Sequence, residues 1–175
     1  PLRRVAVSGT TAWVNGRPVY RFSLTRELEK QGGNQVLEGL IEKALINSEA
    51  KKNNVKVEQS EIDSEIKKIE GSVSSQGLSL DEALKFRNQT RKDLADQIKI
   101  QKIVEKLLSS KITITEAEAK DYFSKNKSLF GQNPVFDKVK DQVNSQLFQQ
   151  KLSEQYNSWI TDLKTKAKIL YFVNL

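Results

Sequence analysis

Apolar residues recur at spacings of three and four along residues 135–168, and Lys, Gln, Asp, Ser and Asn fill most positions between them. This period predicts one amphipathic helix, roughly 50 Å long at the usual rise of ~1.5 Å per residue. An apolar stripe needs a covering surface, so we expect this helix to organise the rest of the fold. The stripe consists of Phe136, Val139, Val143, Leu147, Phe148, Leu152, Tyr156, Trp159, Ile160, Leu163 and Ala167.

The first residues predict a small β hairpin. Residues 11–14 and 18–20 flank Asn15-Gly16, which is a strong signal for a two-residue turn. The tail at residues 169–173 (ILYFV) is also rich in residues that favour strands. We expect the tail to pair with the hairpin, so that a small β-sheet joins the two ends of the chain.

Residues 24–52 predict two helices. The first is short and ends at Gly32-Gly33, because glycine is common just past the end of a helix. The second covers residues 34–52, and its apolar residues occupy more than half of its circumference, which is typical of a largely buried helix. We expect the long terminal helix to pack against its apolar residues Val36, Leu40, Ile41 and Leu45.

Four further helices are expected between residues 58 and 126. A narrow apolar stripe marks the first, over residues 58–73. Each of the other three begins with a capping box, in which Ser or Thr precedes an acidic residue by three positions. The pairs are Ser79 with Glu82, Thr90 with Asp93 and Thr115 with Glu118, and the helices end near residues 86, 108 and 126. The predicted fold class is therefore mainly α.

Composition narrows the classes of function. The chain has no Cys and no His, which excludes disulfides and thiol catalysis and removes the commonest general base and metal ligands. No motif for nucleotide phosphates, dinucleotides or calcium is present. We therefore expect a protein that is not an enzyme and that uses no metal or other cofactor.

The formal charge of +7 arises from 29 basic and 22 acidic residues. Such an excess is compatible with nucleic acid, anionic lipid or acidic polypeptides as partners. However, basic and acidic residues alternate along the expected helices, as in residues 65–70 (EIKKIE), which is typical of solvated helix faces. Because no zinc-finger spacing or RNA-binding aromatic motif accompanies the charge, we expect no nucleic-acid partner.

No stretch approaches the ~20 consecutive apolar residues of a membrane span. The first residues also lack the features of a signal peptide. We therefore expect any export signal or membrane anchor to lie outside this chain.

Several segments follow one another in an order that matches a known family. They are residues 14–19 (VNGRPV), 34–41 (NQVLEGLI), 49–52 (EAKK), 61–66 (EIDSEI), 115–118 (TEAE), 121–123 (DYF) and 126–127 (NK). Together they resemble the N-terminal chaperone module of SurA-like and PrsA-like foldases. Residues 136–143 (FDKVKDQV) resemble the C-terminal helix that returns to complete this module in those proteins.

One departure from the family is large. In the family, parvulin-type prolyl isomerase domains usually lie before the returning helix, whereas here only residues 131–134 occupy that junction. A parvulin domain is far larger, and its site normally uses histidines. The resemblance therefore implies a single chaperone module over residues 1–175, with a helical core and hairpin in residues 1–130 and the returning helix and terminal strand in residues 135–175, and without isomerase activity.

The resemblance implies an ATP-independent holdase that binds unfolded or partly folded polypeptides outside the cytoplasm, in the periplasm or cell envelope, as a monomer or a domain-swapped dimer. The alternative is a structural or adaptor module of the same fold that binds one specific protein. Client binding requires exposed apolar surface ringed by charge. Large apolar residues that a single core does not readily accommodate are candidates for peptide binding, although each is also compatible with a place in the core. They are Leu78, Leu80, Phe86, Tyr122, Phe130, Phe148 and Trp159.

Overall fold

The structure, a computed structural model, describes residues 9–172 and is 74% helical, with six α-helices and a small sheet. This confirms the mainly α fold class. The chain forms two compact units, which are described separately below. Unit 1 comprises the described residues 9–43 and 168–172, and unit 2 comprises residues 44–167.

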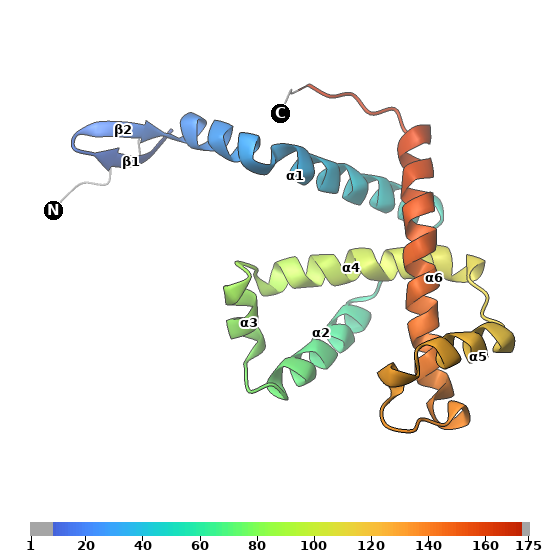
Figure 1. Ribbon diagram of the computed structural model, residues 1–175. Coiled ribbons are helices and arrows are strands. Elements are labelled where there is room, and N and C mark those ends of the chain that lie inside the picture. The colour runs from blue at the N-terminus through green and yellow to red at the C-terminus, as the bar shows by residue number, and fades with distance from the viewer. Residues whose placement is uncertain (1–8, 173–175) are drawn as a thin grey trace. The chain divides into compact units, whose positions relative to one another are not determined.

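The predicted hairpin is confirmed in unit 1. Strands β1 (Thr10–Val14) and β2 (Arg17–Tyr20) pair in antiparallel fashion through the turn at Asn15-Gly16 (Figure 1). Both turn residues have positive φ, 49° at Asn15 and 79° at Gly16. A type I′ turn requires this backbone, which Asn and Gly adopt at the least steric cost.

The predicted third strand is not formed. Among the described residues the sheet contains β1 and β2 alone, and residues 169–172 belong to no sheet; residue 173 lies outside the described residues. A strand-prone segment becomes a strand only when an edge pairs with it. Here the tail instead contacts a helix of the same unit, since the Tyr171 hydroxyl donates to Glu38 Oε1 at 3.2 Å.

Helix α1 (Arg21–Lys52) is continuous, so the prediction of two helices was wrong. Gly32 and Gly33 lie inside it, and neither has the positive φ that would end a helix. Glycine costs a helix interior only ~1 kcal/mol relative to Ala. That cost is small beside the unbroken run of backbone hydrogen bonds, so the helix continues through both residues.

In unit 2, the last turns of α1 form a first hydrophobic core with α4 (Arg91–Leu108) and α6 (Phe136–Lys166). The long terminal helix is thus confirmed, but its expected partners were partly wrong. Val36 and Leu40 are exposed, and Ile46 and Ala50 supply the covering face. The apolar residues of α1 lie on several sides of the helix, so they cannot all face α6. The buried members of this core are Ile46, Ala50, Ile103, Val104, Leu108, Leu152 and Ile160.

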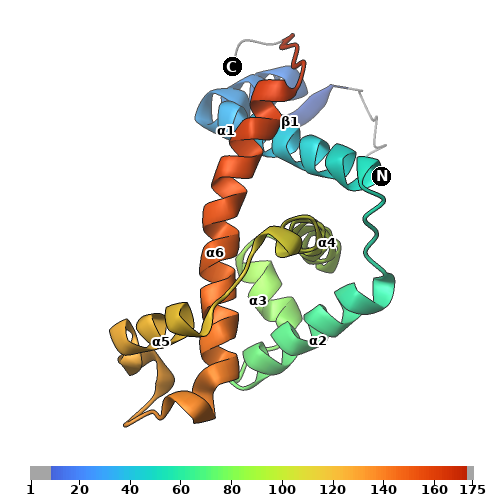
Figure 2. The same ribbon diagram turned by 90° about the vertical axis from the view of Figure 1, so that its right-hand side faces the viewer.

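A second core lies between α6 and α5 (Glu116–Lys125), which both views show against α6 (Figures 1 and 2). Aromatic rings fill much of it. The centroid of Phe123 lies 5.7 Å from that of Phe130 and 5.6 Å from that of Phe136. Phe130 ends the short 3₁₀ helix η2 (Lys127–Phe130), which leads towards α6. One long helix therefore supplies side chains to two separate cores.

Helices α2 (Gln59–Ser74) and α3 (Leu80–Phe86) complete unit 2, with the 3₁₀ turn η1 (Ser109–Lys111) after α4. The three predicted capping boxes are all formed, at the starts of α3, α4 and α5. Helices α2 and α4 are joined by Lys106, whose Nζ donates to Glu61 Oε2 at 2.7 Å and to the Lys56 carbonyl at 2.8 Å. Helix α3 packs against α2.

Candidate functional site

Two of the seven candidate residues are core residues. Leu80 is buried in the first turn of α3, as is Leu84 in its next turn. Phe130 is buried in the second core, where its ring contacts those of Tyr122 and Phe123. Neither side chain offers surface to a ligand, so we assign both to the fold.

Three other candidates are half-buried against the cores. Phe148 and Trp159 pack against the first core, and Tyr122 packs against the second. The Tyr122 hydroxyl also donates to Gln146 Oε1 at 3.4 Å. Phe148 also lines a separate concavity of about 320 Å³ with Ile114 and Gln149. The main contribution of the three candidates is packing.

Leu78 and Phe86 are the two candidates that lie together on an accessible surface. Leu78 is 42% exposed and Phe86 is 81% exposed. With Glu82 and Lys85 they line an open concavity of about 550 Å³, which we call the α3 concavity. It presents more apolar than polar surface, and the two charged side chains stand beside the apolar ones.

Local sequence explains how these four side chains come together. Residues 78, 82 and 86 are spaced by four, so they recur on one side of a helix and of the turn that precedes it. Ser79 caps the helix, with its backbone N–H and hydroxyl donating to Glu82 Oε2 at 2.9 and 2.7 Å. These hydrogen bonds lower the pKa of Glu82 and keep it ionised. Sequence reasoning missed Glu82 and Lys85 as site residues, although their spacing from Leu78 and Phe86 was the available signal.

Arg91 anchors α3 to its neighbours. Its Nε donates to Asp81 Oδ1 at 2.6 Å, and its Nη2 donates to Glu70 Oε1 at 3.2 Å. The hydrogen bond from Arg91 lowers the pKa of Asp81. The start of α4 thereby fixes the start of α3 and the end of α2, while the other end of α3, with Phe86, is left accessible.

The described residues contain no group of three or more acidic side chains positioned to hold a metal ion. None of the helices described is both long and apolar enough to cross a bilayer. The side chains that line the α3 concavity offer apolar contact, with charged groups at its edge.

Comparison with known proteins finds a family and a relative that this chain resembles. The SurA-like N-terminal domain family matches residues 14–108, a segment that includes the whole α3 concavity. A relative from Bacillus subtilis (strain 168), named "Putative peptidyl-prolyl cis-trans isomerase YacD", is 33% identical over 119 residues. The match covers 68% of this chain and 38% of the relative, so the chain spans well under half of that protein. No solved structure matches the chain significantly.

The SurA-like family is associated with the binding of client polypeptides, and SurA-like and PrsA-like members are extracytoplasmic. The family match covers more than half of the chain, and the segment order found in the sequence agrees with it. The chain therefore belongs to the SurA-like N-terminal domain family.

Proposed function

We propose that this chain is an ATP-independent holdase that binds unfolded or partly folded polypeptides outside the cytoplasm and does not catalyse prolyl isomerisation. The observation that carries the proposal is the exposure of Leu78 and Phe86 in a concavity edged by Glu82 and Lys85. Exposed apolar surface beside charge can hold an apolar segment while keeping the chaperone itself from aggregating. The family's association with client polypeptides and its extracytoplasmic location support the same function.

The size of the concavity favours weak and reversible binding. Burying one large apolar side chain contributes ~1.5–3 kcal/mol, so two such contacts contribute roughly 3–6 kcal/mol before the cost of ordering the client. Such free energies correspond to dissociation constants of roughly 6 mM to 40 µM for one segment. A holdase without ATP needs this range, because release must occur without an energy source.

The direct test is suppression of aggregation, followed by light scattering with at least two denatured clients. We expect the chain to suppress scattering at a near-stoichiometric ratio, and the double variant Leu78→Ser/Phe86→Ser to need a several-fold higher concentration. The control is Leu129→Ser/Val135→Ser, which removes two apolar side chains that are also exposed in unit 2 but lie outside the concavity. Equal loss in both variants, or no suppression by the parent chain, would contradict the proposal.

The absence of isomerase activity is proposed for these 175 residues alone. The junction at residues 131–134 is too short for a parvulin domain, and the sequence has no histidine. The relative that is named an isomerase extends far beyond the matched region. In a protease-coupled assay on an X-Pro peptide, we expect cis-trans isomerisation to take the uncatalysed time of tens to hundreds of seconds. An isomerisation rate that rises in proportion to protein concentration would refute the proposed absence of isomerase activity.

A peptide array separates a holdase from an adaptor of the same fold. A holdase should retain many apolar peptides weakly, and Phe86→Ser should weaken most of them. Retention of one peptide at high affinity, with no response to substitution at the α3 concavity, would indicate an adaptor.

A further inference from the structure

Unit 1 exposes aromatic side chains that have no core to enter. None of its described residues is buried. Trp13, Tyr20 and Phe22 are 63%, 54% and 76% exposed. Aromatic residues of this size are costly to leave in water, so their exposure indicates a surface that something else covers.

The same segment carries a concentrated positive charge. The first 26 residues contain five Arg and no acidic residue, whereas basic and acidic residues are mixed in the rest of the chain. Arg17, Arg21 and Arg26 are exposed, and no acidic side chain among the described residues forms an ion pair with any of them. The covering partner should therefore be anionic.

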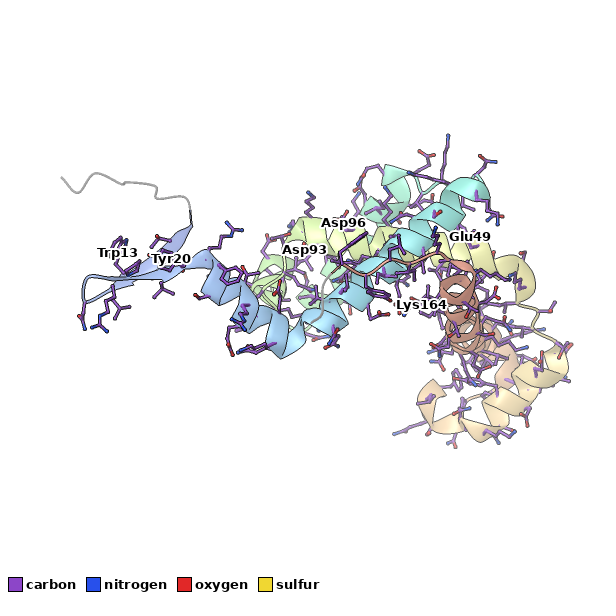
Figure 3. All side chains as sticks on the ribbon, turned by 90° about the horizontal axis from the view of Figure 1, so that it is seen from above. Trp13, Tyr20, Glu49, Asp93, Asp96 and Lys164 are labelled. Atoms are coloured by element: carbon purple, nitrogen blue, oxygen red, sulfur yellow. The ribbon has the colours of Figure 1, made fainter. Side chains whose placement is uncertain are left out.

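The hairpin has exposed apolar side chains on both faces. Cross-strand partners share a face, so the pairing of Trp13 with Pro18 places Trp13 and Tyr20 on one face. Figure 3 shows Trp13 and Tyr20 on the same side of the ribbon. Val14 and Val19 occupy the other face, and both are exposed. A globular partner normally covers one face of a ribbon, whereas the boundary between lipid headgroups and acyl chains can surround both.

We propose that the hairpin and the first turn of α1 bind the surface of an anionic phospholipid bilayer, through a hairpin patch of Trp13, Arg17, Tyr20, Arg21 and Phe22. Trp and Tyr are enriched at membrane interfaces, where their rings lie at the level of the headgroups. Arg side chains extend from that depth to lipid phosphates. The unpaired backbone edges of the two strands keep the hairpin at this boundary, because those groups need water or headgroups as partners.

Charge complementarity favours lipid over a second copy of the chain. Two copies that met through the hairpin patch would bring like charges together, because each patch contains Arg17 and Arg21 and Arg26 lies close by in the sequence. An anionic bilayer instead attracts every one of these residues at once. The hairpin patch shares no residue with the α3 concavity, so lipid binding and client binding can be tested with separate variants.

The test is binding of the full chain to vesicles of phosphatidylglycerol and phosphatidylcholine, compared with vesicles of phosphatidylcholine alone, by flotation at two salt concentrations. We expect at least tenfold tighter binding to the anionic vesicles, weakened by salt. Arg17→Gln/Arg21→Gln/Arg26→Gln should lose most of this preference. The control Lys92→Gln/Lys99→Gln/Lys138→Gln removes the same charge from exposed positions of unit 2 and should retain it. Equal loss in both triple variants would mean that net charge alone drives binding and would overturn the proposal.

Fluorescence tests whether the aromatic residues enter the interface. The chain has two Trp residues, and Trp159 packs against the first core of unit 2. We expect anionic vesicles to shift the emission to shorter wavelength in the parent chain and not in Trp13→Phe. No shift in the parent chain would overturn the proposal. A parent chain that binds no vesicles but self-associates, and that loses this self-association in the triple Arg variant, would overturn the proposal and indicate that a second copy of the chain covers the patch.

Discussion

The two units of this molecule use apolar residues in opposite ways. Every buried apolar residue among those described lies in unit 2, where α6 contributes to two cores. Most of the exposed large apolar side chains lie in unit 1, although unit 1 is much the smaller. The number of apolar residues in a unit therefore does not by itself indicate how stable that unit is. What matters is whether a second element is present to cover each side chain.

The difference also separates two kinds of interaction surface. Unit 2 buries most of its large apolar side chains at least partly, and the α3 concavity is an exception. Hydrogen bonds from Ser79 and Arg91 fix the start of α3, and the concavity lies along the same helix. In unit 1 the hairpin patch combines a two-stranded ribbon, which on its own is marginally stable in water, with the first residues of α1. The first surface lies beside buried side chains of α3, whereas the second lies in a unit whose described residues are all at least partly exposed.

The largest expected effect on the free energy of unfolding comes from replacing one Leu in each unit by Ala. Leu108 is fully buried in the first core, and Leu28 is exposed on α1. We expect Leu108→Ala to lower the free energy of unfolding by ~2–5 kcal/mol, because it leaves a cavity. Leu28→Ala should change it by less than ~0.5 kcal/mol. Urea denaturation followed by circular dichroism measures both, and a loss of several kcal/mol in Leu28→Ala would mean that unit 1 has a core after all.

A smaller effect is expected at Gly32, in the part of α1 that belongs to unit 1. An added Cβ at Gly32 meets no neighbouring atom, and its φ is not in the positive range. Gly32→Ala should therefore stabilise the helix locally by ~0.5–1 kcal/mol. The measurement is amide hydrogen exchange along α1, in which protection should rise around residue 32 and stay unchanged in unit 2. Gly77→Ala is the contrasting variant, because its φ of 80° would strain any other residue. Lower protection around residue 32 would show that the helix breaks there.

The smallest effect concerns an ion pair on the surface of unit 2. Lys151 Nζ donates to Glu118 Oε1 at 2.6 Å, and this hydrogen bond, together with those from Thr115, lowers the pKa of Glu118 from 4.5 to about 2. A lowered pKa in the folded state stabilises the fold above the ordinary pKa of the group. That stability is lost as the pH falls from about 4.5 towards about 2.

The variant Glu118→Gln tests this linkage. Gln still suits the capping box with Thr115, so the change removes chiefly the charge that Lys151 binds. The urea midpoint of the parent chain should exceed that of the variant near neutral pH, and the gap should close towards pH 2. Glu27→Gln is the control in unit 1, where the carboxylate lies 3.7 Å from Lys30, and it should leave the unfolding of unit 2 unchanged. A gap that is independent of pH would contradict the assignment.

Local signals allowed much of the secondary structure to be predicted from the sequence. The turn at Asn15-Gly16 and the three capping boxes lie where their residues indicated, because each depends on hydrogen bonds among residues within a few positions. The helical period of apolar residues over residues 135–168 likewise predicted α6, which the structure has at Phe136–Lys166. For the site, sequence reasoning identified Leu78 and Phe86 together with five residues that the structure assigns mainly to packing.

Two features were decided only by tertiary structure. Leu80 and Phe130 are apolar residues beside loops, like Leu78, and only their neighbours in space bury them. The tail at residues 169–172 has the composition of a strand, but it pairs with neither strand of the hairpin and contacts α1 through Tyr171 instead. Outside α1, where Gly32-Gly33 suggested a break that does not occur, the sequence by itself indicated which segments form helices and turns, since those depend on near neighbours. Burial depends on residues far apart in the chain that meet only in the fold, and so the division between a packed unit and an exposed one became visible only in three dimensions.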